Sequence, residues 1–419
     1  MRFCRHKCRN AGYFIAINRP EAGKEACKPA PAELKPDTKV TTGGRNPHAH
    51  HGYVNTPVYR ASTQLYRTAE DYLAHNGPYF YGRLGTPTSE ALETAIREIE
   101  GPACAGVALL PSGLAAISTA LLAVLKSGDH LLMTDSAYGP ARRFCDGMLA
   151  GCGVTTTYYD PLIGEDIAGL MRPNTRAVYT ESPGSLTFEM QDIPAIADAA
   201  HRHGALVLTD NTWASPLHHK VLEHGADLSI QSGTKYIGGH SDTLLGTVSA
   251  NADALPRLKD TVHGMGLCVG PDDMNLALRG LRTLAVRLAR HQESGLTLAR
   301  WLERRPEVLK VLHPALPSHP GHTIWKRDYT GACGLFAMVL KPVPESAVFA
   351  FLNSLSLFGI GVSWGGFESL AIPVDVTGTR TATTFAPGGP VVRFHAGLED
   401  VGDLTADLER GFAALAAAL

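Results

Sequence analysis

The chain has 419 residues, of which 44% are hydrophobic and 19% charged, a balance typical of a globular protein large enough for two domains. Its 38 basic and 40 acidic side chains leave a net charge of −2, which excludes the strongly basic surface that binds nucleic acid or an anionic membrane. No apolar run approaches the roughly 20 residues of a membrane-spanning helix. We therefore expect a small-molecule partner, with neither nucleic acid nor membrane.

Eight cysteines are scattered without a CxxC pair, which favours reduced thiols and a cytoplasmic protein. Cys4, His6 and Cys8 lie close together, and the segment NPHAHHG (46–52) adds three histidines. Nothing downstream of the Cys4 group completes the four-ligand spacing of a zinc site, and a loop with solvated histidines explains 46–52 better than a metal site does. We therefore expect no bound metal.

The first 45 residues carry ten basic and four acidic side chains. Their apolar run YFIAI (13–17) is shorter than the roughly 7 residues of a secretory signal core. The basic composition fits an organellar targeting segment in part, but no serine precedes Ser62. We expect about residues 1–45 to be a disordered basic extension, or sequence ahead of the true start, within an N-terminal arm that reaches residue 85.

From residue 86 onward, helical and strand patterns alternate. The segment 86–101 predicts a helix with Thr86 as its N-cap and Gly101 as its stop, and 112–129 predicts a second helix that Gly128 ends. The next elements are predicted strands at 130–135, 176–182 and 205–210 and a predicted helix at 193–204. This alternation predicts an α/β fold with a mainly parallel sheet covered on both faces.

After about residue 280 the pattern changes. A helical stretch at 280–306 leads into shorter strands and a helical C-terminus. We expect a large domain at 86–281 and a smaller C-terminal α+β domain at 282–419.

Polar residues gather where predicted strands end. Ser112 and Gly113 lie where the segment LLPSGLAA enters a helix, and free N–H groups at such a start suit a phosphate, although a plain N-cap explains them too. Asp210 ends a strand, and ligands of an open parallel sheet gather outside the carboxyl ends of its strands. Asp210 therefore either caps the next turn or faces a ligand.

The segment DLSIQSGTKYIGGHSD (227–242) places Lys235 among hydroxyls and glycines. A surface lysine in a glycine loop is one interpretation. However, Ser232 and Thr234 would provide hydroxyls beside an anion, and burial would lower the lysine pKa as Schiff-base chemistry requires. A lysine, a strand-end aspartate and a phosphate site at a helix start together form the set that pyridoxal 5′-phosphate (PLP) needs.

The same segment resembles the cofactor-attachment segment of the Cys/Met-metabolism family of PLP-dependent enzymes, which have the aspartate-aminotransferase-like fold, fold type I. Further similar segments occur in the family's order: VNTPVYRAST (54–63), YFYGRLGTPT (79–88), ESPGSLTFEMQDI (181–193), TDNTWASP (209–216), GVSWGGFESLAIP (361–373) and VVRFHAGLED (391–400). The resemblance covers about residues 50–419 and implies that the large domain binds PLP.

The resemblance also implies roles for individual residues. Lys235 would bond the aldehyde of PLP and later move protons at the substrate, and Asp210 would pair with the ring nitrogen. Tyr138 would stack on the ring and act as an acid or base. The phosphate would be surrounded by Gly113, Leu114, Ser232 and Thr234.

Other implied roles involve the substrate and a second subunit. Tyr81 and Arg83 would reach the phosphate of the neighbouring subunit, so a homodimer or homotetramer would share its sites. Arg393 would bind the substrate α-carboxylate, Ser363 would orient it, and Trp364 would wall the side-chain pocket. Taken singly, Tyr138 in a core, Arg393 in a salt bridge and Trp364 in plain packing are equally good interpretations.

Within the family, SWGGFESL with Trp364 is most similar to members that act on L-cystathionine at the β-carbon. Their reaction gives L-homocysteine, pyruvate and ammonia and belongs to methionine biosynthesis. Members acting at the γ-carbon usually carry a different residue at the Trp364 position, and a γ-acting enzyme is the second expectation. A PLP-binding regulator without turnover is the alternative from another class. Val362 replaces a tyrosine of the best-known β-acting member, which leaves the choice among cystathionine, cystine and other cysteine S-conjugates open.

Overall fold

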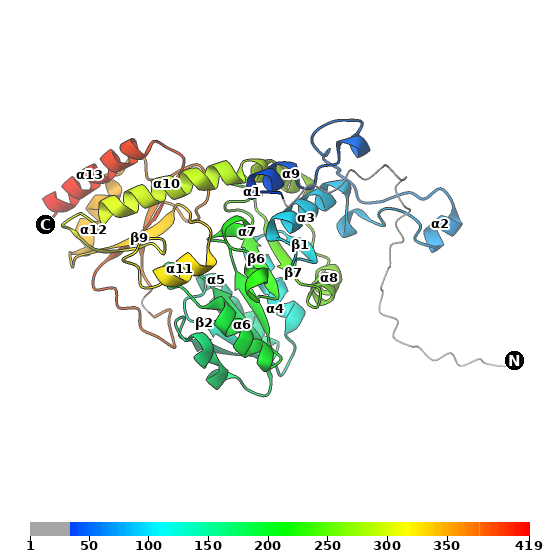
Figure 1. Cartoon of the computed structure of the whole chain (residues 1–419), viewed down its shortest axis with the longest axis horizontal. Helices are drawn as coiled ribbons and strands as arrows, with labels where there is room; N and C mark the ends of the chain where they lie inside the picture. Colours follow the sequence, from blue (N-terminus) through cyan, green and yellow to red (C-terminus); the bar gives the residue numbers. More distant parts are fainter. Residues whose placement is uncertain (1–33, 377) are drawn as a thin grey trace.

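The computed structural model describes residues 34–376 and 378–419. Figure 1 shows a central body around a large sheet, a second sheet beside it towards the C-terminus, and the helix α10 (Leu284–Leu302) running along both. Within these residues, every helix is too short or too polar to span a membrane.

The large sheet has seven strands in the order β1-β7-β6-β5-β4-β2-β3. Its strands are β1 (Gly106–Leu110), β2 (His130–Thr134), β3 (Thr155–Tyr159), β4 (Thr175–Glu181), β5 (Leu206–Asp210), β6 (Leu228–Ser232) and β7 (Gly246–Ala250). Strands β6, β5, β4, β2 and β3 pair in parallel, while β7 pairs antiparallel with both β6 and β1. The prediction of an α/β fold with a mainly parallel sheet is confirmed.

Both faces of this sheet are covered because its strands alternate between two cores. Leu131 and Met133 of β2 lie in one core, and Leu132 lies in the other. The first core includes α4 (Gly113–Val124), α5 (Gly139–Phe144) and α8 (Leu255–Gly264). The second includes α3 (Pro87–Glu100), α6 (Ile193–Arg202) and α9 (Pro271–Arg282). The short α7 (Ser215–His218) follows β5.

The predicted helix at 86–101 is present as α3. The hydroxyl of Thr86 accepts a hydrogen bond from the amide of Ser89, and the hydroxyl of Ser89 accepts one from the amide of Thr86. Gly101 ends the helix at a φ of 98°. The prediction that the next helix runs to Gly128 is wrong, because α4 ends at Val124. The side chain of Asp129 accepts a hydrogen bond from the amide of Lys126 at 2.9 Å, so this amide is not available for a hydrogen bond that would continue the helix.

The C-terminal sheet is antiparallel, in the order β10-β11-β9-β8. Its elements are β8 (Val308–Leu312), α11 (His322–Asp328), β9 (Leu335–Leu340), α12 (Glu345–Asn353), β10 (Leu370–Val374), β11 (Val391–His395) and α13 (Val401–Ala417). The helical stretch predicted at 280–306 is divided between α9 and α10, because Thr283 leaves the helical conformation. The two sheets lie on opposite sides of the expected boundary at 281/282, which stays a prediction.

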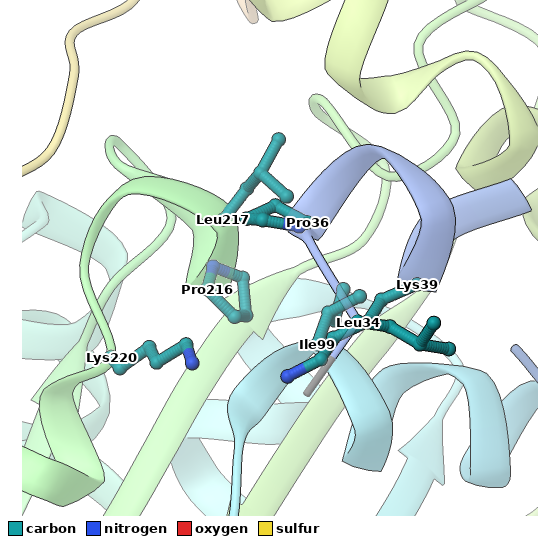
Figure 2. Close-up of a pocket in the computed structure, with 7 residues that line it drawn as sticks. All are labelled: Leu34, Pro36, Lys39, Ile99, Pro216, Leu217 and Lys220. Atoms are coloured by element: carbon teal, nitrogen blue, oxygen red, sulfur yellow. The ribbon is translucent and has the colours of Figure 1, made fainter. Parts of the chain in front are cut away.

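The expectation of disorder up to residue 45 is wrong for residues 34–45, which include the helix α1 (Pro36–Thr42). Val40 is only 2% exposed, and the guanidinium of Arg282 donates to the carbonyls of Val40 and Gly43 at 3.0 and 2.8 Å. Figure 2 shows the small pocket that this helix closes against α3 and α7; it is lined by Leu34, Pro36, Lys39, Ile99, Pro216, Leu217 and Lys220. The predicted extension at 1–33, with Cys4, His6 and Cys8, lies outside the described residues.

Beyond α1, the N-terminal arm leaves the body. Its helix α2 (Ala69–Leu73) lies at the far end of an excursion on the right of Figure 1. Large apolar side chains of this excursion face solvent, with Leu65 88% and Leu73 77% exposed. A single soluble chain rarely leaves such a group uncovered, so the arm has the character of a contact surface.

Candidate active site

The carboxyl edge of the large sheet brings polar residues of three neighbouring strands together. Glu181 ends β4 and pairs in register with Asp210, which ends β5. The hydroxyl of Thr212 donates to Asp210 Oδ1 at 2.6 Å and accepts from the amide of Ser232, at the end of β6, at 2.9 Å. The strand-end aspartate therefore faces the same edge as the serine of the lysine turn.

Lys235 lies in the turn that follows β6, and its amide donates to the carbonyl of Ser232 at 3.0 Å. Its Nζ donates to Ser363 Oγ at 2.5 Å and lies 5.4 Å from the ring centroid of Trp364. Burial and the nearby Arg393 lower the pKa of the Lys235 amine to about 8, although Asp210 opposes this shift. The amine is therefore partly neutral, and nucleophilic, in a pH range where an exposed lysine is not.

The carboxylate of Asp210 is fixed by hydrogen bonds at a position that suits a cation. Burial raises the pKa of its carboxyl, whereas hydrogen bonds from the hydroxyl and amide of Thr212 act to lower it. The hydroxyl of Tyr179 lies 3.5 Å from Asp210 Oδ2. A protonated ring nitrogen placed against this carboxylate would offset the cost of its burial.

Tyr138 immediately precedes α5, and its side chain is 44% exposed. Its amide donates to Glu181 Oε2 at 2.7 Å. Burial, followed by the charge of Glu181, raises the pKa of the Tyr138 hydroxyl, which keeps it protonated. Sequence reasoning missed Glu181, yet the signal was available, because this glutamate lies one residue before the end of the predicted strand 176–182, at the same edge of the sheet as Asp210.

The predicted phosphate residues come together at the start of α4. A Cβ on Gly113 would lie 2.6 Å from Ser232 Oγ, so only a glycine lets the helix start approach the lysine turn so closely. Leu114 follows in the first helical turn and is 40% exposed. The hydroxyl of Thr234 accepts from the amide of Leu245 at 3.0 Å, on the strand connection next to this point. The helix start and its two neighbouring hydroxyls fit a phosphate.

The C-terminal sheet and the loop before β10 contribute further residues to the site. Arg393 lies on β11, is 8% exposed, and donates from Nη2 to the carbonyl of Ser363 at 2.9 Å. Its Nε is buried without a hydrogen-bond partner among the described residues, and burial lowers the pKa of the guanidinium to about 10. A buried donor without a partner is costly, and a carboxylate would satisfy it.

The backbone beside Lys235 is unusual for its residue types. Ser363 has a φ of 82°, in the left-handed region that side chains other than glycine rarely adopt. Gly365 has a φ of 91°, and a Cβ there would lie 2.9 Å from the Cα of Lys235. This strained turn holds the Ser363 hydroxyl against the lysine amine, as strained turns often do at functional sites.

Among residues 34–376 and 378–419, no contact brings Tyr81 or Arg83 to this cluster. They lie on the arm, where Tyr81 is 41% exposed and the guanidinium of Arg83 donates to the carbonyl of His263, in α8, at 3.2 Å. The other predicted residues converge on Lys235, and none of them lines the pocket of Figure 2.

Three features of the site fit PLP: the lysine with a lowered pKa, the partly buried strand-end carboxylate, and the helix start with its hydroxyls. Together with the fold, they define a PLP-dependent enzyme of fold type I. The sequence profile of the "Cys/Met metabolism PLP-dependent enzyme" family matches residues 37–413. The chain belongs to this family, and its cofactor is PLP.

Individual relatives give the same assignment. The chain is 52% identical over 385 residues to a putative cystathionine beta-lyase of Rhizobium johnstonii, which covers 91% of this chain and 96% of the relative. It is 46% identical over 389 residues to the cystathionine beta-lyase of Salmonella typhimurium, covering 90% and 98%. The crystal structure of cystathionine gamma synthase from Xanthomonas oryzae pv. oryzae, in complex with aminoacrylate and cysteine, superposes with a TM-score of 0.86 at 32% identity, covering 93% and 100%.

Proposed function

We propose that this protein is a PLP-dependent carbon–sulfur β-lyase that converts L-cystathionine and water into L-homocysteine, pyruvate and ammonia, a step of methionine biosynthesis in the cytoplasm. The observation that carries the proposal is the contact of Lys235 Nζ with Ser363 Oγ, beside Trp364 and the buried Arg393. The high identity to relatives named cystathionine beta-lyase supports the same reaction.

Substrate binding begins at Arg393. Its partnerless Nε and its Nη2 present N–H donors on one side of a planar group, which matches the two oxygens of an α-carboxylate. Ser363 fixes this guanidinium through its carbonyl and orients the same carboxylate. Trp364 walls the pocket that takes the substrate side chain.

Proton transfer is the work of Lys235 and Tyr138. Bound PLP supplies an aldehyde for covalent attachment and a ring that draws electrons from the substrate α-carbon. The neutral amine of Lys235 accepts the α-proton, and a positioned base of this kind contributes typically about 10²–10⁴-fold to the rate. The aromatic ring of Tyr138 would stack on bound PLP, and its protonated hydroxyl would donate a proton to the leaving sulfur as the carbon–sulfur bond breaks. Homocysteine leaves, and the three-carbon fragment hydrolyses to pyruvate and ammonia.

The remaining residues hold the cofactor in place. Asp210 keeps the ring nitrogen protonated, with its carboxylate fixed by Thr212. The phosphate would be bound by Gly113, Leu114, Ser232 and Thr234 of one subunit and by Tyr81 and Arg83 of its neighbour. The exposed apolar arm supports this sharing of sites in a homodimer or homotetramer.

A product assay tests the reaction. Purified protein is incubated with a panel of thioether amino acids, and pyruvate, 2-oxobutyrate and free thiol are measured together. Pyruvate with homocysteine from cystathionine is the expected result. The γ-acting alternative, supported by the similarity to a cystathionine gamma synthase structure, predicts 2-oxobutyrate with cysteine instead. A regulator without turnover predicts no steady release of either product.

A further inference from the structure

The connection between β10 and β11 reaches from the C-terminal domain to the edge of the large sheet. Asp135 is the first residue after β2, and both of its carboxylate oxygens accept hydrogen bonds from this connection. Oδ1 accepts from the amide of Thr381 at 3.0 Å, and Oδ2 accepts from the amides of Ala382 and Thr383 at 3.0 and 2.7 Å. The Thr383 hydroxyl adds a bond of 2.9 Å. One carboxylate thus binds three consecutive backbone amides of the other domain.

Two arginines complete this contact. Arg142 donates to Asp135 Oδ1 at 2.8 Å and to the Thr381 hydroxyl at 3.2 Å, so it touches both domains. Arg380 crosses in the opposite direction and donates to Glu189 at 2.7 Å and to the Thr187 hydroxyl at 2.6 Å. We call Asp135, Arg142, Glu189 and the segment 380–383 the interdomain latch.

The latch is buried and charged. Asp135 is only 2% exposed, and the side chain of Arg380 is 8% exposed. Burial alone would raise the pKa of Asp135, but hydrogen bonds from Thr381, Thr383 and Arg142 outweigh it and lower the pKa. The carboxylate therefore stays ionised, and charge-assisted bonds of this kind are the strong ones in a protein.

The latch touches the two loops that hold Tyr138. Asp135 lies three residues before Tyr138 in the turn into α5. Glu189 lies in the loop after β4, whose last residue, Glu181, accepts from the Tyr138 amide. On the other side, the latched segment leads through residues 384–390 to β11, which carries Arg393. The latch therefore connects the coenzyme side of the site to the substrate side.

We propose that Asp135 is a positioning residue, whose bonds to the amides of Thr381, Ala382 and Thr383 hold the guanidinium of Arg393 at the correct place over the coenzyme face beside Tyr138. This inference rests on the proposed role of Arg393 as the carboxylate ligand. Asp135 touches neither substrate nor reacting atoms; it acts through the domain that it holds.

The test uses two small reagents that both attack the coenzyme aldehyde and release Lys235, which changes the visible absorbance. Aminooxyacetate carries a carboxylate, whereas O-methylhydroxylamine has none. In Asp135→Asn, an amide N–H₂ faces the N–H donors of Ala382 and Thr383, so the latch opens. We expect the holoenzyme variant to react with aminooxyacetate at least about tenfold more slowly than wild type. The reason is that a misplacement of a binding group by about 1 Å can cost about 10²-fold in rate. Its rate with O-methylhydroxylamine should stay within about twofold of wild type.

Asp407→Asn is the matched control. Asp407 is equally buried and also accepts from three consecutive amides, those of Ser356, Leu357 and Phe358, but entirely within the C-terminal domain. This variant should lose stability without changing the ratio of the two reagent rates. Arg380→Gln removes the guanidinium contacts to Glu189 and Thr187 but leaves the bonds from Asp135 to the three amides in place. It should therefore shift the ratio in the same direction as Asp135→Asn and by less.

The outcomes separate the inference from the proposed function, because neither reagent requires cleavage of cystathionine. An unchanged ratio in Asp135→Asn, or an equal slowing with both reagents, contradicts the positioning role. Should Asp135→Asn fail to fold, an unchanged ratio in Arg380→Gln has the same meaning. The ratio of the aminooxyacetate rate to the O-methylhydroxylamine rate should be higher in wild type than in Arg393→Leu. Equal ratios in the two proteins would also overturn the inference, because Arg393 would then not bind the carboxylate.

Discussion

Two regions carry predicted cofactor ligands, and they differ in how complete they are. At the carboxyl edge of the large sheet, Asp210 and Ser232 lie on neighbouring strands and are joined through Thr212. On the N-terminal arm, Tyr81 is 41% exposed, and Arg83 donates to a carbonyl of α8 rather than to the lysine cluster. Sheet register assembles the first region within a single chain.

The difference indicates what completes the second region. Strands are placed by their neighbours in the same sheet, so the residues at their ends meet as soon as the domain folds. The described part of the arm lies outside both sheets, and Tyr81 pairs in an isolated bridge with Thr63 of the same arm. In our proposal, a second copy of the chain covers the exposed apolar side chains of the arm, which include Leu65 and Leu73. In our proposal the phosphate site is finished only by oligomerisation.

The largest effect is expected from removing the nucleophile of the complete region. Lys235→Ala takes away both the attachment point and the base, and turnover should fall by about 10³–10⁴-fold or more. The variant should still fold, since Lys235 Nζ makes one hydrogen bond, to Ser363, within the part of the chain that the structure describes. Pyruvate release from cystathionine by purified protein measures the loss, and a variant with normal turnover would be incompatible with the proposal.

The next largest effect concerns the substrate side. In Arg393→Leu the paired N–H donors are lost, and kcat/KM for cystathionine should fall by about 10²–10³-fold, mainly through KM. Arg393→Lys keeps the charge but not the planar donor geometry, so it should recover only part of this loss. If the lysine variant performed as well as wild type, Arg393 would not bind the carboxylate with two bonds.

The arm is tested by its contribution to cofactor binding. Arg83→Ala should weaken PLP binding by about 10–100-fold, the value of one or two hydrogen bonds to a charged group. When this variant is mixed with Lys235→Ala and allowed to exchange subunits, mixed oligomers should regain activity at limiting PLP. Each such pair has one site with an intact lysine and an intact arginine from its neighbour. Absence of recovery after proven exchange would place both regions of a site in one chain.

A smaller effect follows from the pKa of Lys235. A protonated amine cannot attack an aldehyde, so attachment of PLP to the apoprotein should slow about tenfold per pH unit below a midpoint near 8 and level off above it. An amine with an ordinary pKa, such as that of Nα-acetyl-lysine, should instead accelerate up to about pH 10.4. Attachment is followed by absorbance, and a protein that behaved like the free amine would show that burial does not activate Lys235.

The features that could be predicted from sequence are those carried by local pattern. Thr86 and Gly101 bound α3 as expected. Lys235 and its hydroxyl neighbours indicated the candidate site through the pattern of a single turn. Asp210 could be placed because the carboxyl ends of parallel strands meet at one edge. Glu181 could have been found by the same argument.

The features that escaped prediction depend on contacts between distant parts of the chain. Residues 34–45 are ordered because Arg282 binds the carbonyls of Val40 and Gly43. Helix α4 stops early because the Asp129 side chain captures an amide. The contact between Asp135 and the amide of Thr383 joins residues 248 positions apart, and no periodicity records it.

The central claim is that the amine of Lys235 carries the cofactor, and reduction of the holoprotein tests it most directly. Borohydride fixes the bond between PLP and its amine, and digestion followed by mass spectrometry locates the added phosphopyridoxyl group. Our account predicts a yellow protein whose modification lies on the peptide containing Lys235. A modification on any other lysine, or an unmodified Lys235 peptide from coloured protein, would contradict it.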